Sequence, residues 1–441
     1  MPARFKKNPK KQVNATERFR FIKDPCHGYI FINELDKDLI DTAVFQRLRR
    51  IKQLSGSEFV YPGANHTRFE HSLGVRYLAE IMAKSLSNDE DVELKKEEIV
   101  LVQTAALLHD IGHGPFSHTF EALLSKIGKH HEDFSKWLVE QTEIGDILKD
   151  HGYNPKLISG LIHGSKTIKK KAYLNQIISG ACDVDKMDFI VRDSYHTGAE
   201  YGRVDIMRIL YTMGVFEENL AVNYSALSAL EAFLIARVES FRTIYFHKVS
   251  RGSQLMVVRA MELAEEELNL LDFDQPEDYL KLDDYSLWTM LRDCPQSKKI
   301  MQDLSERKLL KVAFEREFMT RDEFLQSTLS DDKYRQRVIE LIAQEADVDP
   351  AKVFIDIPTL PSVPYSHSID LPAYEIPMFT RDRKTKEKIS VDIKKVSRIF
   401  EALMGMMYIF RVYTDRKERE KVRSAAQKVL GKEPIEKSIS F

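Results

Sequence analysis

Polar side chains gather at the end of an apolar stretch in the segment AALLHDIGHGPFSHTFE. His109 and Asp110 are adjacent there, and His113, His118 and Glu121 follow them closely. Neighbouring residues on a helix are offset by about 100°, so His109 and Asp110 can bind one ion only if it lies over their shared edge. Other ligands of such a site must therefore come from elsewhere in the chain.

Two residues in other segments could complete a metal site. His71 lies in NHTRFEHSLGV, on the helix expected before this segment, and Asp185 lies in ACDVDKMDFIVRD, on a later helix. Taken singly, each such residue is more often an ordinary surface or core residue. Two imidazoles and two carboxylates together suit Mn, Fe, Mg, Ni or Zn, and they leave positions for water and a phosphate oxygen. We therefore expect one divalent ion, held by His71, His109, Asp110 and Asp185.

The elements that carry these residues are expected to be mostly helical. From Asp41 to about Tyr245 apolar residues recur at helical spacing, as in EEIVLVQTAALLHDIGHG, and strand-like alternation is limited to short stretches such as YIFINEL. The polar segments SLSNDEDVELKKEE and GKHHED are typical of connections between helices. Beyond about Leu270 the helical pattern continues to Ala346.

The C-terminal part is predicted to form a smaller α+β lobe. KVFIDIPTLPSVPYSHSIDLP and EIPMFTRDRKTKEKISVDI resemble strands joined by Pro-rich or charged turns. From about Ile393 we expect a return to helix, through RIFEALMGMMYIFRVYT and a charged segment that runs to Leu430. The chain thus divides into a basic arm at 1–17, expected to be disordered, a catalytic lobe at 18–270, and a helical, then α+β, lobe at 271–441.

Composition bounds the class of protein. Lys plus Arg number 66 and Asp plus Glu number 68, so anion binding must come from locally clustered cations rather than from net charge. The three cysteines, Cys26, Cys182 and Cys294, lack CxxC spacing and fit a reducing cytoplasm. The sequence has no apolar run of about 18 residues, and its basic start is unlike a signal peptide. We therefore expect a cytoplasmic protein without a membrane span.

These segments together resemble the HD-domain superfamily, whose spaced H…HD…D signature is matched by His71, His109, Asp110 and Asp185. More narrowly, the chain is similar to the dNTP triphosphohydrolases, which include bacterial dGTP-type enzymes and the vertebrate sterile-alpha-motif HD enzyme, although no sterile-alpha-motif module is expected here. The resemblance covers over half of the chain, through DPCHGYI, QRLRRIKQL, RFEHSLGV, HDIGHGPFSH, DVDKMDF and YFHKVSRG. It implies a multi-helical HD fold and attack of a metal-activated water on the α-phosphorus of a dNTP, which releases deoxynucleoside and tripolyphosphate.

The resemblance also implies catalytic roles. His118 is the candidate acid that protonates the 5′ oxygen, and Glu121 would orient His118 or raise its pKa. Some family members carry Asp where this chain has Glu121. His113 and His131 would contact phosphate. His113 also shares a helical face with His109 if the helix continues that far, and the alternative is a histidine favoured by the dipole at a helix C-terminus.

Two helical stripes are candidates for substrate contacts. In DVDKMDFIVRD, Lys186, Phe189 and Asp193 share one face, while Asp188 and Arg192 are four residues apart and can pair with each other. In ARVESFRTIYFHKVSR a second stripe mixes cations with aromatic residues, and the alternative is an ordinary amphipathic helix. The members of this stripe are Arg237, Phe241, Tyr245 and Lys248.

By resemblance, Arg68, Lys186 and Arg237 would bind phosphate, and Asp193 and Tyr245 would contact the sugar. Arg68 could instead pair with an acid such as Glu70. Gln53 and Leu54 match positions that bind the sugar 3′ hydroxyl and exclude a 2′ hydroxyl, which implies a deoxynucleotide substrate. Phe189 replaces a phosphate-contacting tyrosine, and Phe246 stands where some members carry a base-reading Gln, so the preferred base is not predicted.

Regulation by nucleotides is a further implication of the resemblance. Family members form homotetramers with activating GTP or dNTP at subunit interfaces, and Asp41, Gln46 and Arg49 match residues that read an activating guanine. Arg208 would serve a neighbouring nucleotide site. The alternative is structural, because Asp41 could cap a helix and QRLRRIK could be a solvated face. SALSALEAFLIARVES also lacks the basic residues that some relatives place before Arg237.

Two other functions remain open from the sequence. Nucleotidases and cyclic-nucleotide phosphodiesterases share the bare H…HD…D pattern, so the chain could be another HD phosphohydrolase. It could instead be a nucleic-acid-binding protein that uses the basic arm and keeps a structural metal site, although the near-neutral charge disfavours this. The first alternative predicts orthophosphate or a monophosphate as product, and the second predicts salt-dependent binding to single strands.

Overall fold

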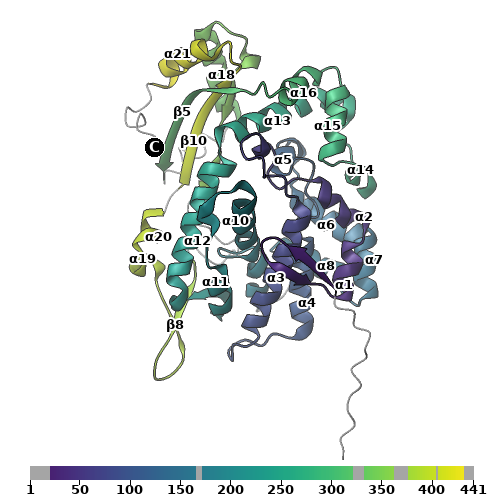
Figure 1. Cartoon of the computed structure of the whole chain (residues 1–441), viewed down its shortest axis with the longest axis vertical. Coiled ribbons are helices and arrows are strands. Elements are labelled where there is room, and N and C mark those ends of the chain that lie inside the picture. Colours follow the sequence, from purple (N-terminus) through teal and green to yellow (C-terminus); the bar gives the residue numbers. More distant parts are fainter. Residues whose placement is uncertain (1–19, 165–170, 321–331, 362–375, 404–405, 432–441) are drawn as a thin grey trace, which may run out of the picture.

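The computed structural model describes residues 20–164, 171–320, 332–361, 376–403 and 406–431. The predicted basic arm lies outside these ranges, as do 362–375 of the predicted strand region. A large helical lobe makes up most of the molecule, and a smaller lobe that contains β5 and β10 lies at one end of it, at the top of Figure 1. The prediction of a mostly helical protein with a smaller α+β C-terminal part is confirmed.

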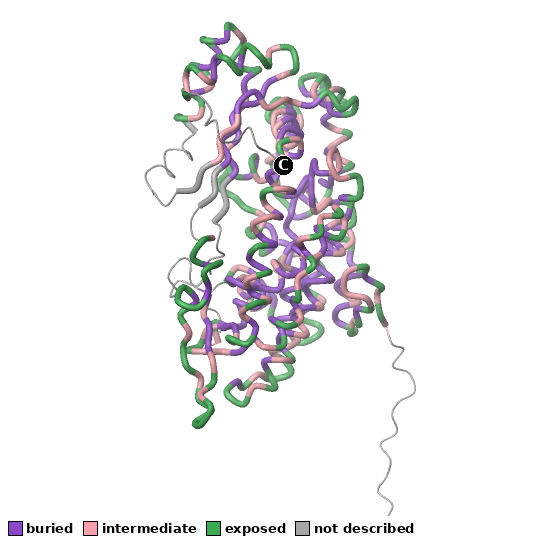
Figure 2. Tube along the Cα trace, turned by 60° about the vertical axis from the view of Figure 1, so that its left-hand side comes forward, coloured by how far each residue is buried: buried purple, intermediate pink, exposed green. Residues whose placement is uncertain are grey.

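Helices and two short antiparallel hairpins form the large lobe. Its helices are α1 (Glu34–Ile40), α2 (Ala43–Gln46), α3 (Arg68–Leu86), α4 (Lys96–Leu108), α5 (His118–Leu124), α6 (His131–Gln141), α7 (Glu143–Asp150), α8 (Pro155–Ile162), α9 (Ala172–Ile178), α10 (Val184–Thr197), α11 (Ile206–Thr212), α12 (Leu227–Ser240) and α13 (Lys248–Leu268). The hairpins pair β1 (Phe21–Asp24) with β2 (Gly28–Phe31) and β3 (Met213–Phe216) with β4 (Asn219–Asn223). Figure 2 shows that buried segments run through the middle of this lobe.

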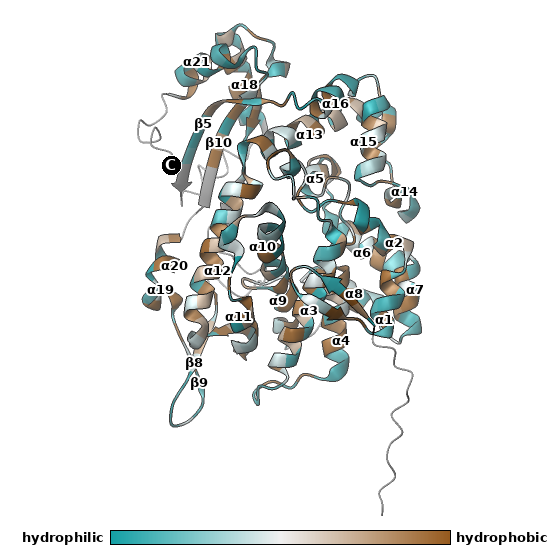
Figure 3. Ribbon diagram, viewed as in Figure 1, coloured by the Kyte–Doolittle hydropathy of each residue, from teal (hydrophilic) through white to brown (hydrophobic). Residues whose placement is uncertain are grey.

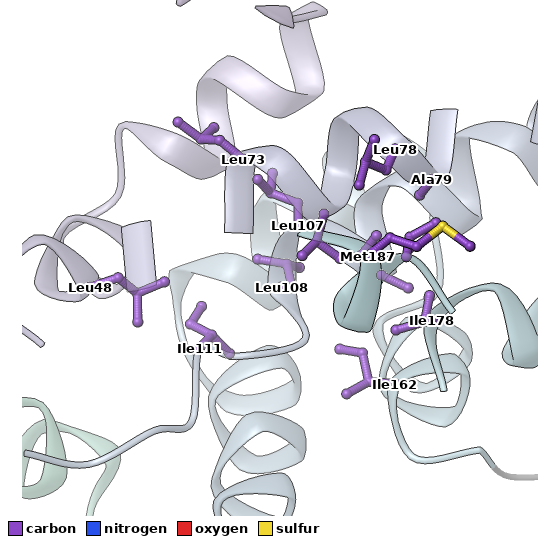
Figure 4. Packing of buried hydrophobic residues seen from close by; sticks show 14 of the residues in the cluster. Leu48, Leu73, Leu78, Ala79, Leu107, Leu108, Ile111, Ile162, Ile178 and Met187 are labelled. Atoms are coloured by element: carbon purple, nitrogen blue, oxygen red, sulfur yellow. The ribbon is translucent and has the colours of Figure 1, made fainter. Parts of the chain in front are cut away.

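Helices α3, α4 and α10 form the centre of the core. Figure 4 shows Leu73 and Leu78 of α3 close to Leu107 of α4 and Met187 of α10, and all four side chains are buried. Gly74 permits the close approach of α10, because a Cβ there would lie 1.9 Å from Asp188 Oδ1. The contact between α3 and α10 brings the segments that carry His71 and Asp185 together.

Helix α4 ends at Leu108, so His109 and Asp110 lie just beyond its last turn. The helix does not continue to His113, so the shared helical face of His109 and His113, which depended on that continuation, does not form. Pro115 disfavours helix for the residue before it, and the loop at Gly112 packs so closely on α6 that a Cβ there would lie 2.1 Å from the Ser135 backbone nitrogen. A side chain at this position would separate the loop from α6.

Three helices extend the large lobe, and a second core forms in the smaller one. The added helices are α14 (Pro276–Leu280), α15 (Asp284–Asp293) and α16 (Lys298–Ser305). The smaller lobe contains β5 (Lys311–Thr320), α18 (Asp332–Ala346), β6 (Phe354–Asp356), β7 (Thr359–Pro361), β10 (Met406–Thr414) and α21 (Arg419–Leu430). Strand β10 lies between β5 and β6, and Phe314, Ile342 and Val412 pack in the core of this lobe. Helices α18 and α21 are largely hydrophilic in Figure 3, as expected for a cover exposed to water.

The chain between the two halves of this sheet returns to the large lobe. It forms β8 (Met378–Arg381), β9 (Lys388–Ser390), α19 (Ile393–Val396) and α20 (Arg398–Leu403). Strand β8 pairs in parallel with β4, so β3, β4, β8 and β9 make one four-stranded sheet. Among the described helices, none combines the length and the apolar content that a membrane crossing requires.

Two predictions of continuous helix in the C-terminal half are wrong. Strand β5 interrupts the expected helix between Leu270 and Ala346, and MMYIFRVYT forms β10 rather than helix. The residues from Ile409 to Val412 are all buried, and periodicity cannot distinguish such a run from a buried helix. The long antiparallel pairing of β5 with β10 determines both strands, and it joins parts of the chain far apart in sequence.

Candidate active site

His71, His109, Asp110 and Asp185 meet where α3, the end of α4 and the start of α10 converge. The Nε2 atom of His71 lies 3.0 Å from Asp185 Oδ1 and 3.6 Å from Asp110 Oδ2. The Nε2 atom of His109 lies 3.2 Å from Asp110 Oδ1 and 3.7 Å from Asp185 Oδ1. The structure thus brings together all four predicted ligands, which come from three separate segments.

The hydrogen bonds of the two rings fit a metal centre. His71 places Nδ1 2.8 Å from Asp188 Oδ2, and His109 places Nδ1 2.8 Å from the Ala106 carbonyl oxygen. Donation from Nδ1 in both rings leaves both Nε2 lone pairs toward the carboxylates, an arrangement common for metal-binding histidines. The buried Nε2 of His109 has no hydrogen-bond partner within the described residues. This set of donors could hold one divalent ion.

A buried ion-pair network supports His71 from behind. Arg192 donates to Asp188 at 2.8 and 3.0 Å and to Asp24 at 2.8 Å, which confirms the predicted pairing of Asp188 with Arg192. His27 adds a contact of 2.6 Å to Asp188. Burial alone would raise the pKa of Asp188, but Arg192 and the two histidines hold it well below its usual range. Asp24 and His27 had no predicted role, because only the fold brings β1–β2 to α10.

A second polar group lies beside the first, formed by the other four predicted catalytic residues. Glu121 joins two rings, because one oxygen lies 3.1 Å from His118 Nδ1 and the other bonds His131 Nδ1. His113 stacks on His131 with ring centroids 3.8 Å apart, and its Nε2 lies 3.4 Å from Asp110 Oδ1. Burial and the nearby charge of Arg68 lower the pKa of His113 well below 6.5. The ring of His113 is therefore neutral, and it connects the two groups.

The pair formed by Glu121 and His131 should make stability depend on pH. Burial alone lowers the pKa of His131, but Glu121 outweighs it and raises that pKa above 6.5. Burial likewise raises the pKa of Glu121, but His118 and His131 outweigh it and hold that pKa well below 4.5. The stabilisation of the fold by ionised Glu121 is present above about pH 4.5. The stabilisation by protonated His131 is complete below about pH 6.5 and is lost as pH rises through its raised pKa.

We expect Glu121→Gln to lower Tm most between about pH 4.5 and pH 6.5. The difference in Tm between the variant and the wild type should be smaller at higher pH. Thermal unfolding of both proteins from pH 5 to 9 measures this, and a gap that does not change with pH would refute it.

The loop that leads into α5 has a strained backbone. Phe116 and Ser117 have φ of 57° and 54°, although neither is glycine. Such backbone persists only where the surroundings hold it, and it concentrates at functional sites. The Asp284 carboxylate on α15 accepts the backbone N–H of Phe116 at 2.6 Å and that of Lys52 at 2.9 Å. Burial raises the pKa of Asp284 to about 6 despite these two donors.

Three other side chains, from α14, from the turn after α2 and from the start of α3, hold the same loop. Tyr279 donates to the Gly112 carbonyl at 2.6 Å, and Arg47 donates to the His113 carbonyl at 2.9 Å. Arg68 donates to Ser117 Oγ at 2.7 Å and pairs with Asp110. Contacts from Tyr279 on α14, Asp284 on α15, Arg47 and Arg68 thus hold the backbone between Asp110 and His118.

Replacing Asp284 with Ala should therefore impair turnover from a distance. The strained loop would lose the hydrogen bond at Phe116, and the adjoining segment would lose the one at Lys52. The loop would then relax, which would displace His118 at the start of α5. A displacement of about 1 Å costs on the order of 100-fold in rate, so we expect a fall in kcat approaching that size with metal content unchanged. Steady-state kinetics and metal analysis test this, with exposed Asp293→Ala as the control from the same helix. Wild-type kcat in the Asp284 variant would show that this contact does not position the loop.

A cavity of about 320 Å³ opens beside the two polar groups. Six predicted site residues line it, namely Gln53, Leu54, Arg68, His118, Asp193 and Tyr245. Apolar side chains form much of the remaining wall, among them Phe116, Phe189, Phe241 and Phe246. Tyr245 donates a hydrogen bond to Asp193 across the wall. Gln254 also lines the cavity and was not predicted, because its position depends on a hydrogen bond of 2.7 Å to the Ser55 carbonyl.

Of the predicted phosphate-binding residues Arg68, Lys186 and Arg237, the last two do not line this cavity, and neither do His113 and His131. Lys186 instead donates to Asp183 Oδ2 at 2.5 Å and to the Gly180 carbonyl at 3.1 Å. Arg237 is buried on α12, with its guanidinium carbon 5.4 Å from the centre of the Phe241 ring. A π-helical turn, Phe241–Tyr245, follows α12, and such turns occur often at functional sites.

The residues predicted to read an activating nucleotide fall in two places. Gln46 accepts from Arg49 Nε at 2.8 Å and donates to the Ile40 carbonyl at 2.8 Å, beside Asp41 at the end of α1. Arg208 lies on α11 and donates to the Ser225 carbonyl at 3.1 Å. None of these four residues lines the cavity described above.

Sequence comparison places two conserved regions on this chain. The HD domain matches residues 68–192, and the HD associated region matches residues 204–440. An uncharacterised protein of Methanocaldococcus jannaschii is 35% identical over 66% of this chain and 59% of its own length. The deoxynucleoside triphosphate triphosphohydrolase SAMHD1 homolog of Dictyostelium discoideum is 31% identical over 67% of this chain and 60% of its own length. The chain thus spans no more than about 60% of these relatives.

Solved structures match over nearly the whole chain. A hypothetical protein from Aquifex aeolicus has a TM-score of 0.73 and 30% identity, covering 92% of this chain and 99% of that one. A phosphohydrolase from Bacteroides thetaiotaomicron has a TM-score of 0.71 and 26% identity, covering 90% of this chain and 100% of that one. The resemblance to known structures therefore extends through both lobes.

Proposed function

Because this chain belongs to the family of HD-domain proteins with an HD-associated region, which includes dNTP triphosphohydrolases, we propose that it converts a dNTP and water into deoxynucleoside and tripolyphosphate. One observation carries the proposal. The group that could hold a metal adjoins a histidine and glutamate group, and the latter reaches a cavity lined by the residues expected to contact a deoxyribose. This arrangement supports the proposal that phosphate chemistry and sugar recognition occur at one site.

The metal would be held by His71, His109, Asp110 and Asp185. A divalent ion bound there would supply Lewis acidity and would lower the pKa of water. The chain's own part is to fix the ligands, through the Nδ1 hydrogen bonds of both histidines and the ion pairs behind His71. These contacts preorganise the site before substrate arrives.

His118 is the proposed acid for the 5′ oxygen of the leaving deoxynucleoside. Its side chain is 68% exposed and lines the cavity, whereas His113 is buried and His131 is nearly so. Glu121 accepts from Nδ1, which leaves Nε2 as the atom able to donate a proton. His113 and His131 would contact phosphate oxygens beside the metal group.

The remaining contacts divide between phosphate and sugar. Arg68 lines the cavity and would grip phosphate, and Lys186 and Arg237 would do so after turning away from their present partners. Gln53, Leu54, Asp193 and Tyr245 would surround the deoxyribose, with Leu54 excluding a 2′ hydroxyl. Family membership also supports a homotetramer activated by GTP or a dNTP at Asp41, Gln46, Arg49 and Arg208.

Product analysis tests the proposal. Each dNTP is incubated with Mn or Mg, with and without GTP, and tripolyphosphate is resolved from orthophosphate, using Asp185→Ala as control. Tripolyphosphate that is lost in the control would support it. Orthophosphate or a monophosphate would indicate a different HD phosphohydrolase. The absence of turnover, combined with salt-dependent binding to single strands, would indicate a nucleic-acid-binding protein.

A further inference from the structure

A buried histidine outside the cavity contacts a carboxylate on its wall. The side chain of His66 is fully buried, and its Nε2 lies 2.7 Å from Asp193 Oδ1. The other oxygen of Asp193 accepts from the Tyr245 hydroxyl. Asp193 and Tyr245 line the cavity, whereas His66 does not. The side chain of His66 thus acts on the cavity through Asp193.

The backbone of His66 holds a second residue of the same wall. Its carbonyl accepts from the Gln53 N–H at 3.0 Å, and an isolated bridge joins the next residues, Lys52 and Thr67. Gln53 and Asp193 are the two residues proposed to bind the sugar hydroxyl. One residue therefore positions both of them, Gln53 through the main chain and Asp193 through the side chain.

The hydrogen bonds of the His66 ring offset only part of the free-energy cost of burying it. It stacks on His196 with centroids 4.3 Å apart and planes 14° apart, and its buried Nδ1 has no hydrogen-bond partner within the described residues. Burying a polar atom without a partner is unfavourable, so an apolar side chain would suit this place better if packing were its only role. The single bond to Asp193 is the interaction that an apolar residue could not make.

We propose that His66 is a positioning residue for recognition of the 3′ hydroxyl of a deoxynucleotide, an inference that rests on the proposed function. His66 and Tyr245 each engage one oxygen of Asp193, which fixes the plane of the carboxylate. Each oxygen retains a lone pair that can accept from a ligand hydroxyl. Without His66 the carboxylate can rotate about its last bond, and its alignment with the sugar is lost.

Paired substrates separate this role from a merely structural one. We expect His66→Ala to lower kcat/KM for a dNTP on the order of tenfold, as a hydrogen bond to a charged group would, and to change kcat/KM for the matching 2′,3′-dideoxy analogue less than about twofold. His66→Gln, whose amide can reach Asp193, should restore most of the preference. His66→Asn keeps a buried amide that is too short to reach Asp193, and it should behave like the Ala variant. Tm and metal content are measured for every variant, and the Asn variant replaces the Ala variant if the latter does not fold.

The possible results of this experiment distinguish the role of His66 from the proposed sugar contacts and from the proposed function. A wild-type preference for the dNTP that shrinks in His66→Ala and His66→Asn and returns in His66→Gln supports the inference. An equal loss for both substrates would mean that His66 only supports the fold, and it would overturn the inference while leaving the proposed function intact. A wild type that releases tripolyphosphate equally well from the dNTP and from its dideoxy analogue would overturn both the proposed sugar contacts and this inference. A wild type that releases no tripolyphosphate would overturn the proposed function itself.

Discussion

Asp185→Ala is expected to abolish turnover and to remove most of the bound metal. Asp185 Oδ1 lies 3.0 Å from Nε2 of His71 and 3.7 Å from Nε2 of His109, so this oxygen faces both imidazole ligands. Residues that only orient metal ligands typically cost about 10- to 100-fold when they are replaced, and a direct ligand should cost more. We therefore expect a loss of more than about 100-fold in kcat/KM, measured together with metal content by elemental analysis.

The controls for Asp185 separate binding from folding. Asp185→Asn has nearly the same shape but one weaker oxygen ligand, so it should retain part of the metal. Asp146→Ala removes an exposed carboxylate from α7 and should change neither quantity. Full metal content and wild-type kinetics in Asp185→Ala would show that the ion lies elsewhere, and the assignment of all four ligands would fail with it.

The second large effect is expected from His118→Ala. Loss of a positioned general acid typically costs about 10²- to 10⁴-fold, and we expect kcat to fall within this range while metal content stays at the wild-type level. Glu121 would lose one of its two histidine partners but would keep His131, so the local fold should persist. Steady-state kinetics with a dNTP measure the effect, and exposed His130→Ala on the neighbouring helix start is the matched control.

A substrate with a better leaving group tests what His118 does. A nitrophenolate leaves without protonation, so hydrolysis of a nitrophenyl tripolyphosphate should be impaired much less by His118→Ala than hydrolysis of a dNTP. Equal losses on both substrates would assign His118 to binding or orientation instead. A dNTP rate unchanged from the wild type would exclude any catalytic role for this residue.

Local sequence patterns identified the side chains that meet at the candidate site better than they identified the residues around it. His71, His109, Asp110 and Asp185 were identifiable because four ligand-type residues occur in three segments with helical spacing, and α3, α4 and α10 bring them together. His118 and Glu121 are three residues apart at the start of one helix, so their contact was also local. The helical lobe was predictable for a related reason. The spacing of apolar residues that indicates a helix can be read within a short stretch of sequence.

Most wrong predictions of secondary structure, and the site residues that were not predicted, involve contacts between distant parts of the chain. Asp284 supports the strained loop at Phe116 across 168 residues, and His66 meets Asp193 across 127. No spacing rule connects residues so far apart. The same reason explains β10, because a buried apolar run becomes a strand here through its pairing with β5 and β6. The end of α4 at Leu108 was different, because Gly112, Gly114 and Pro115 are local signals in the sequence that disfavour continuation of the helix to His113.

We propose that water attacks the α-phosphorus and that the tripolyphosphate chain leaves intact. Hydrolysis of dGTP in ¹⁸O-labelled water, under the metal and activator conditions that give turnover, tests this most directly by mass spectrometry of the products. We expect the tripolyphosphate to carry the ¹⁸O atom and the deoxynucleoside to be unlabelled. Label in orthophosphate or in a deoxynucleoside monophosphate would contradict it, because the bond that breaks would then lie elsewhere in the nucleotide.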